Sequence, residues 1–200
     1  MTQTDIAKLE FDKIIKATVG GNPVEMGCVR GSDTVLLIKT GQGGSIFGYE
    51  NKYLHLAHAI RQKYGYSVFV SATVNDSREV FEGEMQIVDA FFGGAPYQMY
   101  YMGVSKGGLI GCWYGADYAQ IKRMMTVNAP LMINFHNRTL PSIKRFEEGC
   151  LTMIYGSLDA SYRYVPFVEK HARVKVIENA DHNMSGMPTV YEELAEELLN

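Results

Sequence analysis

One serine in this chain has neighbours that could turn it into a nucleophile. Residues Gly103-Val104-Ser105-Lys106-Gly107 form a G-x-S-x-G pentapeptide between the apolar run Tyr97 to Met102 and a glycine-rich, helix-like stretch. This setting is typical of a sharp strand-to-helix corner called the nucleophile elbow. The serine at such a corner has a strained backbone, and glycines two residues before and after it avoid clashes. The pattern therefore predicts that Ser105 presents its hydroxyl above the edge of a sheet.

A serine hydroxyl reacts only when a base accepts its proton and a carboxylate orients that base. In a parallel sheet such groups gather at the carboxyl ends of the strands. His182 follows the last expected strand and is the predicted base, since the other histidines lie within a helix, in an irregular stretch or at the opposite edge (His55, His58, His136 and His171). Asp159, which follows the expected strand Leu151 to Tyr155, is the predicted acid. Asp181 is its rival, but an immediate neighbour of His182 is poorly placed to reach the far ring nitrogen. A loop carboxylate that caps the next helix is the plainer interpretation of Asp159.

Attack on a carbonyl also creates an oxyanion, which needs preorganised N–H donors. The backbone N–H of Lys106, directly after the serine, is one predicted donor. The other is expected from the loop Thr40-Gly41-Gln42-Gly43-Gly44-Ser45, whose glycines allow the backbone to approach a ligand closely. A plain glycine turn is the alternative for this loop. A phosphate-binding loop is disfavoured because Ile46 occupies the third glycine position of G-x-G-x-x-G.

The rest of the sequence predicts strands that alternate with helices. A hairpin of two strands, Leu9 to Thr18 and Val24 to Arg30, is expected first, followed from Thr34 by β-α alternation. Helices are expected over Tyr53–Tyr64, Arg78–Phe92, Gly107–Tyr118, Tyr162–His171 and Pro188–Leu199. The pattern predicts a single three-layer α/β domain over residues 1–200, with a mostly parallel sheet and an antiparallel N-terminal hairpin.

Composition excludes several classes of partner. A net charge of −3 and a pI near 6.0 do not indicate the basic surface that binding to nucleic acid requires. No apolar run approaches the roughly 20 residues that span a bilayer, and the N-terminus lacks the pattern of a signal peptide. Three cysteines without C-x-x-C spacing indicate reduced thiols in a cytoplasmic protein, with Cys112 in the core. No metal or organic cofactor is implied, and the oligomeric state stays open.

From about Thr34 to its C-terminus the chain resembles the α/β-hydrolase superfamily. The resemblance rests on the loop at residues 40–44, the pentapeptide around Ser105, Gly156-Ser157-Leu158-Asp159 and Asp181-His182, which occur in the family's order. It implies that Ser105 is the nucleophile, His182 the base and Asp159 the acid, with oxyanion N–H groups from Gln42 and Lys106. Thr40 stands where many members have histidine. Only about two dozen residues separate Val127 from Leu151, which implies little or no cap domain.

These features together predict a serine hydrolase that cleaves a small carboxylic ester or thioester through an acyl-enzyme. Apolar side chains expected in loops around Ser105 suggest a modest acyl pocket, although core packing explains any one of them equally well (Phe47, Met132, Phe135, Tyr162 and Met184). The same fold would also admit a C–C bond hydrolase, an amidase or peptidase, or a cofactor-free perhydrolase. A non-catalytic binding protein that keeps the pocket is the alternative from another class.

Overall fold

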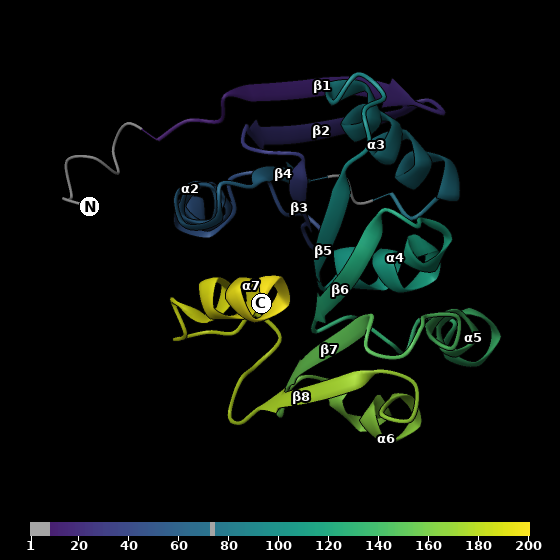
Figure 1. Cartoon of the computed structure of the whole chain (residues 1–200). Coiled ribbons are helices and arrows are strands. Elements are labelled where there is room, and N and C mark those ends of the chain that lie inside the picture. The colour runs from purple at the N-terminus through teal and green to yellow at the C-terminus, as the bar shows by residue number, and fades with distance from the viewer. Residues whose placement is uncertain (1–8, 73–74) are drawn as a thin grey trace. The chain divides into compact units, whose positions relative to one another are not determined.

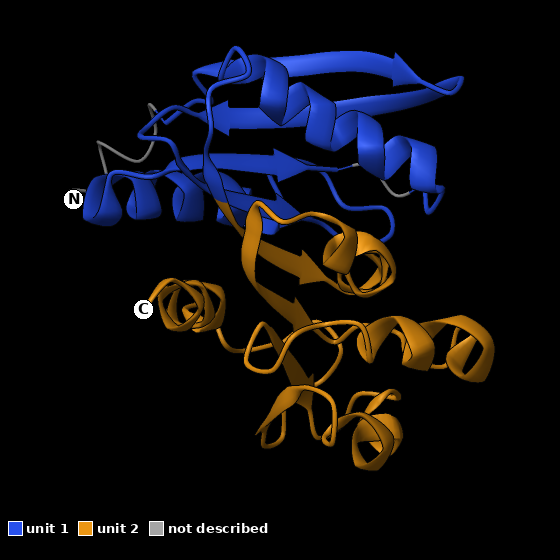
Figure 2. Ribbon diagram, turned by 45° about the vertical axis from the view of Figure 1, so that its right-hand side comes forward, with its two compact units in different colours: residues 1–98 blue, residues 99–200 orange. Residues whose placement is uncertain are grey.

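The computed structural model describes residues 9–72 and 75–200. The chain divides into two compact units, Met1–Gln98 and Met99–Asn200 (Figure 2). Each unit combines the strands of a β-sheet with helices, as the alternating pattern predicts. The single domain over residues 1–200 stays a prediction.

The first unit begins with the expected antiparallel hairpin. Its strands follow the order β1-β2-β4-β3, with the bounds β1 (Lys13–Val19), β2 (Asn22–Val29), β3 (Thr34–Lys39) and β4 (Ser67–Ser71). Gly20 and Gly21 make the turn between β1 and β2, and both have positive φ angles. β2 pairs antiparallel with β1 and β4, whereas β3 and β4 are parallel. Every residue of β3 and β4 is buried, as is typical of strands covered on both faces.

The helices of the first unit are η1 (Tyr49–Asn51), α2 (Lys52–Tyr64) and α3 (Arg78–Phe91). α2 ends at Gly65, whose left-handed backbone lets its N–H reach the Arg61 carbonyl. α3 begins after Ser77, whose hydroxyl accepts a hydrogen bond from the Val80 N–H. Figure 1 shows the two helices on opposite faces of the strands, which gives this unit its three layers.

The second unit contains the parallel part of the sheet, with the strand order β5-β6-β7-β8. The strands are β5 (Gln98–Val104), β6 (Ile121–Val127), β7 (Leu151–Gly156) and β8 (Arg173–Ile177). Val104 pairs with Val127, Val127 with Ile154, and Gly156 with Ile177. The carboxyl ends of these strands therefore meet at one edge.

Helices cover both faces of these strands. Figure 1 shows α7 (Val190–Leu199) on one face and α4 (Lys106–Tyr114), α5 (Leu140–Ile143) and α6 (Val165–Val168) on the other. The short helices η2 (Gly115–Asp117), η3 (Phe135–Thr139) and η4 (Tyr162–Tyr164) lie between them in the chain. Cys112 is buried within α4, as predicted.

The expected helix Tyr162 to His171 is wrong in its extent. The structure has only the 3₁₀ turn η4 followed by the single turn α6. Pro166 is the reason, because proline fits only in the first turn of an α-helix and α6 therefore cannot extend back through Tyr162. The helix expected over Gly107–Tyr118 is likewise shorter, since α4 ends at Tyr114 and continues as η2.

The segment between β6 and β7 forms no helical cap. Its residues 128–150, all of them described, contain only η3 and α5 as helices. The Trp113 indole N–H donates to Thr139 Oγ1 over 2.9 Å, and the Arg138 guanidinium lies 3.7 Å from the centre of the Trp113 ring. These contacts hold the segment against α4.

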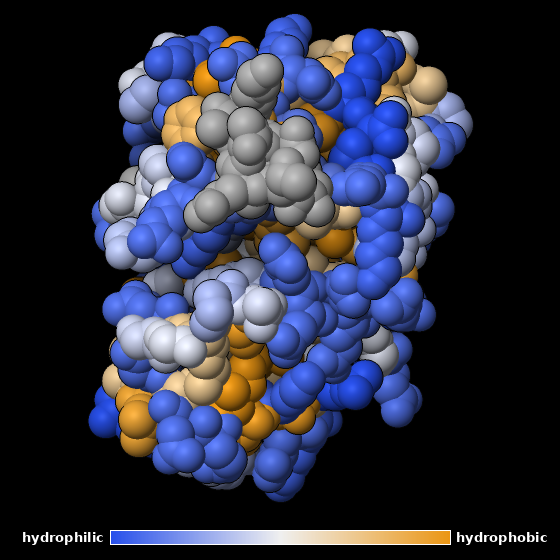
Figure 3. All heavy atoms as spheres, turned by 90° about the vertical axis from the view of Figure 1, so that its left-hand side faces the viewer, coloured by the Kyte–Doolittle hydropathy of each residue, from blue (hydrophilic) through white to orange (hydrophobic). Residues whose placement is uncertain are grey.

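The surface is mixed in character. On the face drawn in Figure 3, hydrophilic residues cover most of the area and apolar ones gather in a patch in its lower half. Among the helices that the structure describes, none is both long and apolar enough to cross a membrane.

A buried ion pair lies inside the first unit. Lys39 Nζ at the end of β3 is 2.6 Å from both carboxylate oxygens of Glu84 on α3, and both side chains are almost wholly buried. The hydroxyl of Ser71, at the end of β4, donates to the same carboxylate. Removing one partner would leave an uncompensated charge in the interior.

We expect Lys39→Met to lower the free energy of unfolding by about 3–5 kcal/mol. The double change Lys39→Met with Glu84→Leu should lower it much less, because neither charge is then buried alone. Lys16→Met is the matched control, since the Lys16–Glu25 pair is exposed and should contribute at most about 1 kcal/mol. Urea denaturation measures all three. Equal losses in the single and double variants would contradict this account.

Candidate active site

Ser105 lies at the expected corner, between the end of β5 and the start of α4. Its backbone has φ 51° and ψ −120°, a conformation that is costly for any residue with a side chain. Its N–H donates to the carbonyl of Val127 on β6 over 2.7 Å, and its carbonyl accepts from Leu109 N–H on α4. Hydrogen bonds on both sides therefore hold the strained residue in place.

Close backbone approach explains the first glycine of the pentapeptide. A Cβ atom at Gly103 would lie 2.6 Å from the Gly108 Cα and 2.7 Å from the Gly107 carbonyl oxygen. The Tyr101 hydroxyl donates to that same Gly107 carbonyl over 2.7 Å inside the core. Since backbone atoms cannot move aside cheaply, any larger residue at position 103 would push the first turn of α4 away from β5.

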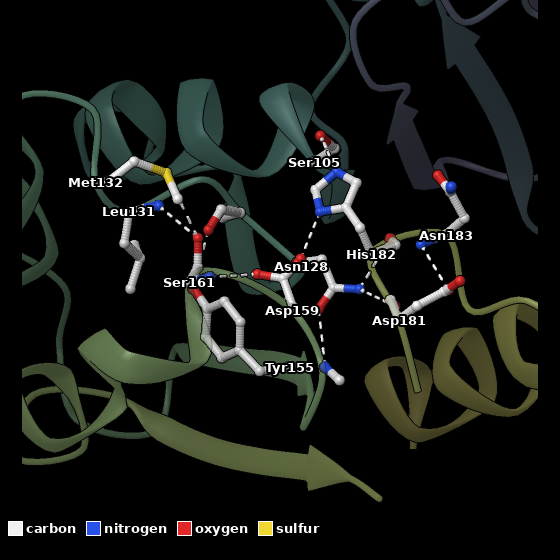
Figure 4. Close-up of polar contacts among 12 residues, drawn as sticks. Ser105, Asn128, Leu131, Met132, Tyr155, Asp159, Ser161, Asp181, His182 and Asn183 are labelled. Carbon is white, nitrogen blue, oxygen red and sulfur yellow. Dashed lines mark hydrogen bonds and ion pairs between the residues drawn. The ribbon is translucent and has the colours of Figure 1, made fainter. Parts of the chain in front are cut away.

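The structure brings Ser105, His182 and Asp159 together in one chain of contacts (Figure 4). Ser105 Oγ lies 2.9 Å from His182 Nε2, and His182 Nδ1 lies 2.5 Å from Asp159 Oδ2. The Asp159 side chain is 1% exposed, whereas that of His182 is 46% exposed. With the Nδ1 proton donated to the carboxylate, Nε2 is free to accept the proton of the serine hydroxyl.

The loops after β7 and β8 carry Asp159 and His182. The loops after these strands are joined by hydrogen bonds from Ser157 N–H to the Ile177 carbonyl and from Leu158 N–H to the Ala180 carbonyl, both 3.0 Å. A Cβ atom at Gly156 would lie 2.2 Å from the Ala180 carbonyl oxygen, so only glycine permits this approach. Main-chain contacts alone therefore hold the two loops together.

Asp181, the rival acid, makes different contacts. Its Oδ1 accepts hydrogen bonds from the N–H groups of Asn183 and Ser185, over 3.0 and 2.9 Å. The bonds from Ser185 are the main reason that the pKa of this exposed carboxyl lies below its ordinary value. Asp181 therefore closes its own turn, while the ring of His182 contacts Asp159.

The surroundings of His182 favour its protonated form. The hydrogen bond to Asp159 is the main cause that raises the pKa of His182 above 6.5. Partial burial opposes this shift, and the negative charges of Asp159 and Asp181 add to it. Such an imidazole is a stronger proton acceptor than a free one.

The two residues predicted to bind an oxyanion lie in different units. Lys106 is the first residue of α4 and directly follows Ser105. Gln42 lies in the first unit within the turn closed by the hydrogen bond from Gly44 N–H to the Gly41 carbonyl. Donation by Gln42 and Lys106 to an oxyanion stays a prediction.

The residues predicted to line an acyl pocket differ in burial. Phe135 and Met184 are buried, Met132 is half-buried, and Phe47, in the first unit, and Tyr162 are exposed. The Phe135 ring packs 4.7 Å from that of Tyr164 and 5.7 Å from that of Phe167, so packing accounts for its burial. A pocket formed by these side chains stays a prediction.

Two polar residues that sequence reasoning passed over support the site. The Ser161 N–H donates to Asp159 Oδ1 over 2.6 Å, and its hydroxyl accepts from the Leu131 N–H. Asn128, directly after β6, bonds the loop that carries His182. The position of Asn128 at a strand's carboxyl end was the available signal, because the same rule selects the acid and the histidine.

Solved structures share this arrangement of elements over nearly the whole chain. Est1E from Butyrivibrio proteoclasticus matches with a TM-score of 0.72 at 12% identity, covering 93% of this chain and 97% of that one. An esterase from Pyrococcus furiosus matches with a TM-score of 0.72 at 14% identity, covering 100% and 95%. A protein from Xanthomonas campestris, described as a serine hydrolase without a lid, matches with a TM-score of 0.68 at 12% identity, covering 96% and 95%.

The chain therefore has the α/β-hydrolase fold, as the sequence predicts. By sequence, neither a protein-family model nor a curated protein matches it.

We expect Asp159→Asn to lower the pKa of His182, because it removes the negative charge and replaces a charge-assisted hydrogen bond with at most a neutral one. The His182 ring should then be less protonated at every pH near its midpoint. Asp181→Asn should lower the pKa less, since only a through-space charge is lost. An NMR titration of the His182 ring measures both shifts. A larger shift in Asp181→Asn than in Asp159→Asn would reverse the assignment of the histidine's partner.

Proposed function

We propose that this protein is a serine hydrolase that cleaves a small carboxylic ester or thioester through an acyl-enzyme. One observation carries the proposal: Ser105 Oγ, at a strained corner, is 2.9 Å from His182 Nε2, whose other ring nitrogen contacts the buried Asp159 carboxylate. A nucleophile, its base and the group that orients the base are thus in the order that acyl transfer needs. The Pyrococcus furiosus esterase that shares the fold adds support by analogy.

Acylation begins when His182 Nε2 accepts the Ser105 proton and Oγ attacks the substrate carbonyl carbon. The carbonyl oxygen becomes an oxyanion, which the N–H of Lys106 at the start of α4 stabilises. Asp159 stabilises the imidazolium that forms and keeps its Nε2 directed at the reacting atoms. The tetrahedral intermediate collapses as His182 returns the proton to the leaving oxygen or sulfur.

Deacylation repeats these steps with water. His182 removes a proton from the attacking water, and the hydroxide adds to the acyl carbon. Collapse of the second intermediate returns a proton to Ser105 Oγ and releases the carboxylic acid. All proton transfers pass through one imidazole, which suits the raised pKa of His182.

Labelling by a fluorophosphonate tests the proposal. Ser105→Ala should fold normally, resist the probe and lose activity toward activated esters by a factor of roughly 10⁴ or more. Adding His182→Ala to Ser105→Ala should cost little further activity, because residues of a catalytic unit are not additive. Equal labelling of wild type and Ser105→Ala would contradict the assignment of Ser105 as the nucleophile. An unlabelled wild type would favour a non-catalytic binding protein.

Substrate length should reflect the missing cap. Because residues 128–150 are held against α4, we expect them not to enclose a long acyl chain, and each methylene left in water forgoes about 0.8 kcal/mol. For p-nitrophenyl esters from acetate to palmitate below micelle formation, kcat/KM should rise over the first few carbons and then level off or fall. No lag or interfacial jump should occur. A steady climb to the longest chain would indicate a deep acyl tunnel instead.

A further inference from the structure

Asn128 is a buried polar residue at the carboxyl end of β6, and its side chain reaches the end of β7 and the loop after β8 (Figure 4). Its Nδ2 donates to the main-chain carbonyls of Asp181 over 3.1 Å and of His182 over 3.0 Å. Its Oδ1 accepts from the Gly156 N–H over 2.9 Å. One amide thus joins the end of β7 to the residues that carry the histidine.

The backbone of Asn128 is anchored as firmly as its side chain. Its N–H donates to the Ile154 carbonyl over 2.9 Å, and the preceding residue, Val127, accepts from the Ser105 N–H. Its φ of 50° lies in the left-handed region, which asparagine tolerates better than most residues with a side chain. Val127 and Asn128, two consecutive residues, therefore link the main chain of Ser105 to that of His182.

The chemistry of these bonds requires a carboxamide. Two carbonyl oxygens need a group with two N–H donors, and the Gly156 N–H needs an acceptor on the same short side chain. Aspartate has the same shape but would turn an oxygen toward both carbonyls. A side chain that lost these bonds would leave buried polar groups unpaired.

We propose that Asn128 is a positioning residue for the hydrolase reaction: it fixes the main chain at His182 so that Nε2 meets Ser105 while Nδ1 meets Asp159. This inference rests on the proposed function. The three side-chain bonds of Asn128 all go to main-chain groups, so it acts through the position of the histidine. A displacement of reacting groups by about 1 Å can cost a factor of about 10² in rate.

Two variants separate the parts of this role. Asn128→Gly keeps the left-handed backbone without strain and removes all three side-chain bonds. Asn128→Asp keeps the acceptor for Gly156 and replaces the donor to the two carbonyls. Asn179→Gly and Asn179→Asp are matched controls, because Asn179 is also left-handed (φ 59°) and precedes His182 in the same loop, but is exposed.

The readouts are kcat and KM per active site titrated with a fluorophosphonate, and the NMR signal of the His182 Nδ1 proton. Titration counts only folded, reactive sites, so loss of stability alone does not change the rates. Both Asn128 variants should lower kcat about 10²-fold, leave KM within about twofold, and shift or broaden the proton signal. Both Asn179 variants should behave as wild type.

Wild-type kcat and an unchanged proton signal in Asn128→Gly would overturn the proposal and leave Asn128 a merely structural residue. A shared fall in the Asn128 and Asn179 variants would also overturn it, because the effect would then belong to the loop. If the wild type shows no labelling, the proposed function fails, while the proton signal still reports whether Asn128 holds His182 against Asp159.

Discussion

The parallel register of β5, β6 and β7 is the constraint on which the site depends. Val104 pairs with Val127, and Val127 pairs with Ile154. Ser105 and Asn128, which directly follow β5 and β6, therefore lie at the same edge of the sheet. The hydrogen bonds from Ser105 N–H to Val127 and from Asn128 N–H to Ile154 continue the ladder by one step beyond the strands. A slip in this register would separate Ser105 from the loops that carry His182 and Asp159.

The site also concentrates local strain where the sheet can hold it. Ser105 and Asn128 both have positive φ angles, each of a kind that costs roughly 1–3 kcal/mol. Each lies directly after a buried strand and is tied to the neighbouring strand through its N–H. The strands therefore fix the conformations that the side chains need, and the stability of the sheet offsets the cost.

The grouping of Ser105, Asp159 and His182 could be predicted from the sequence because it follows a rule of position. Ser105, Asp159 and His182 each come after a recognisable apolar strand, and parallel strands place their carboxyl ends together. Asn128 follows the same rule, but its partners are main-chain carbonyls 53 and 54 residues away. The direction of these carbonyls depends on how the loop after β8 folds, and the sequence pattern does not predict the conformation of that loop. The predicted length of the helix over residues 162–171 is wrong for a local reason, because the constraint from Pro166 outweighs the apolar periodicity.

Unequal burial of the acid and the histidine divides their tasks. In the proposed mechanism Asp159, which is 1% exposed and accepts from the Ser161 N–H, acts on the imidazolium where little water screens its charge. His182, 46% exposed, keeps an edge toward solvent, and in the proposed mechanism the water for deacylation arrives there. Deeper burial of the histidine would lower its pKa and block that water, whereas greater exposure of the acid would weaken its hold on the ring. A fixed carboxylate behind a half-exposed imidazole therefore suits the proposed mechanism better than either extreme. Asn128 bonds the main chain at His182 rather than the ring, which leaves the ring exposed.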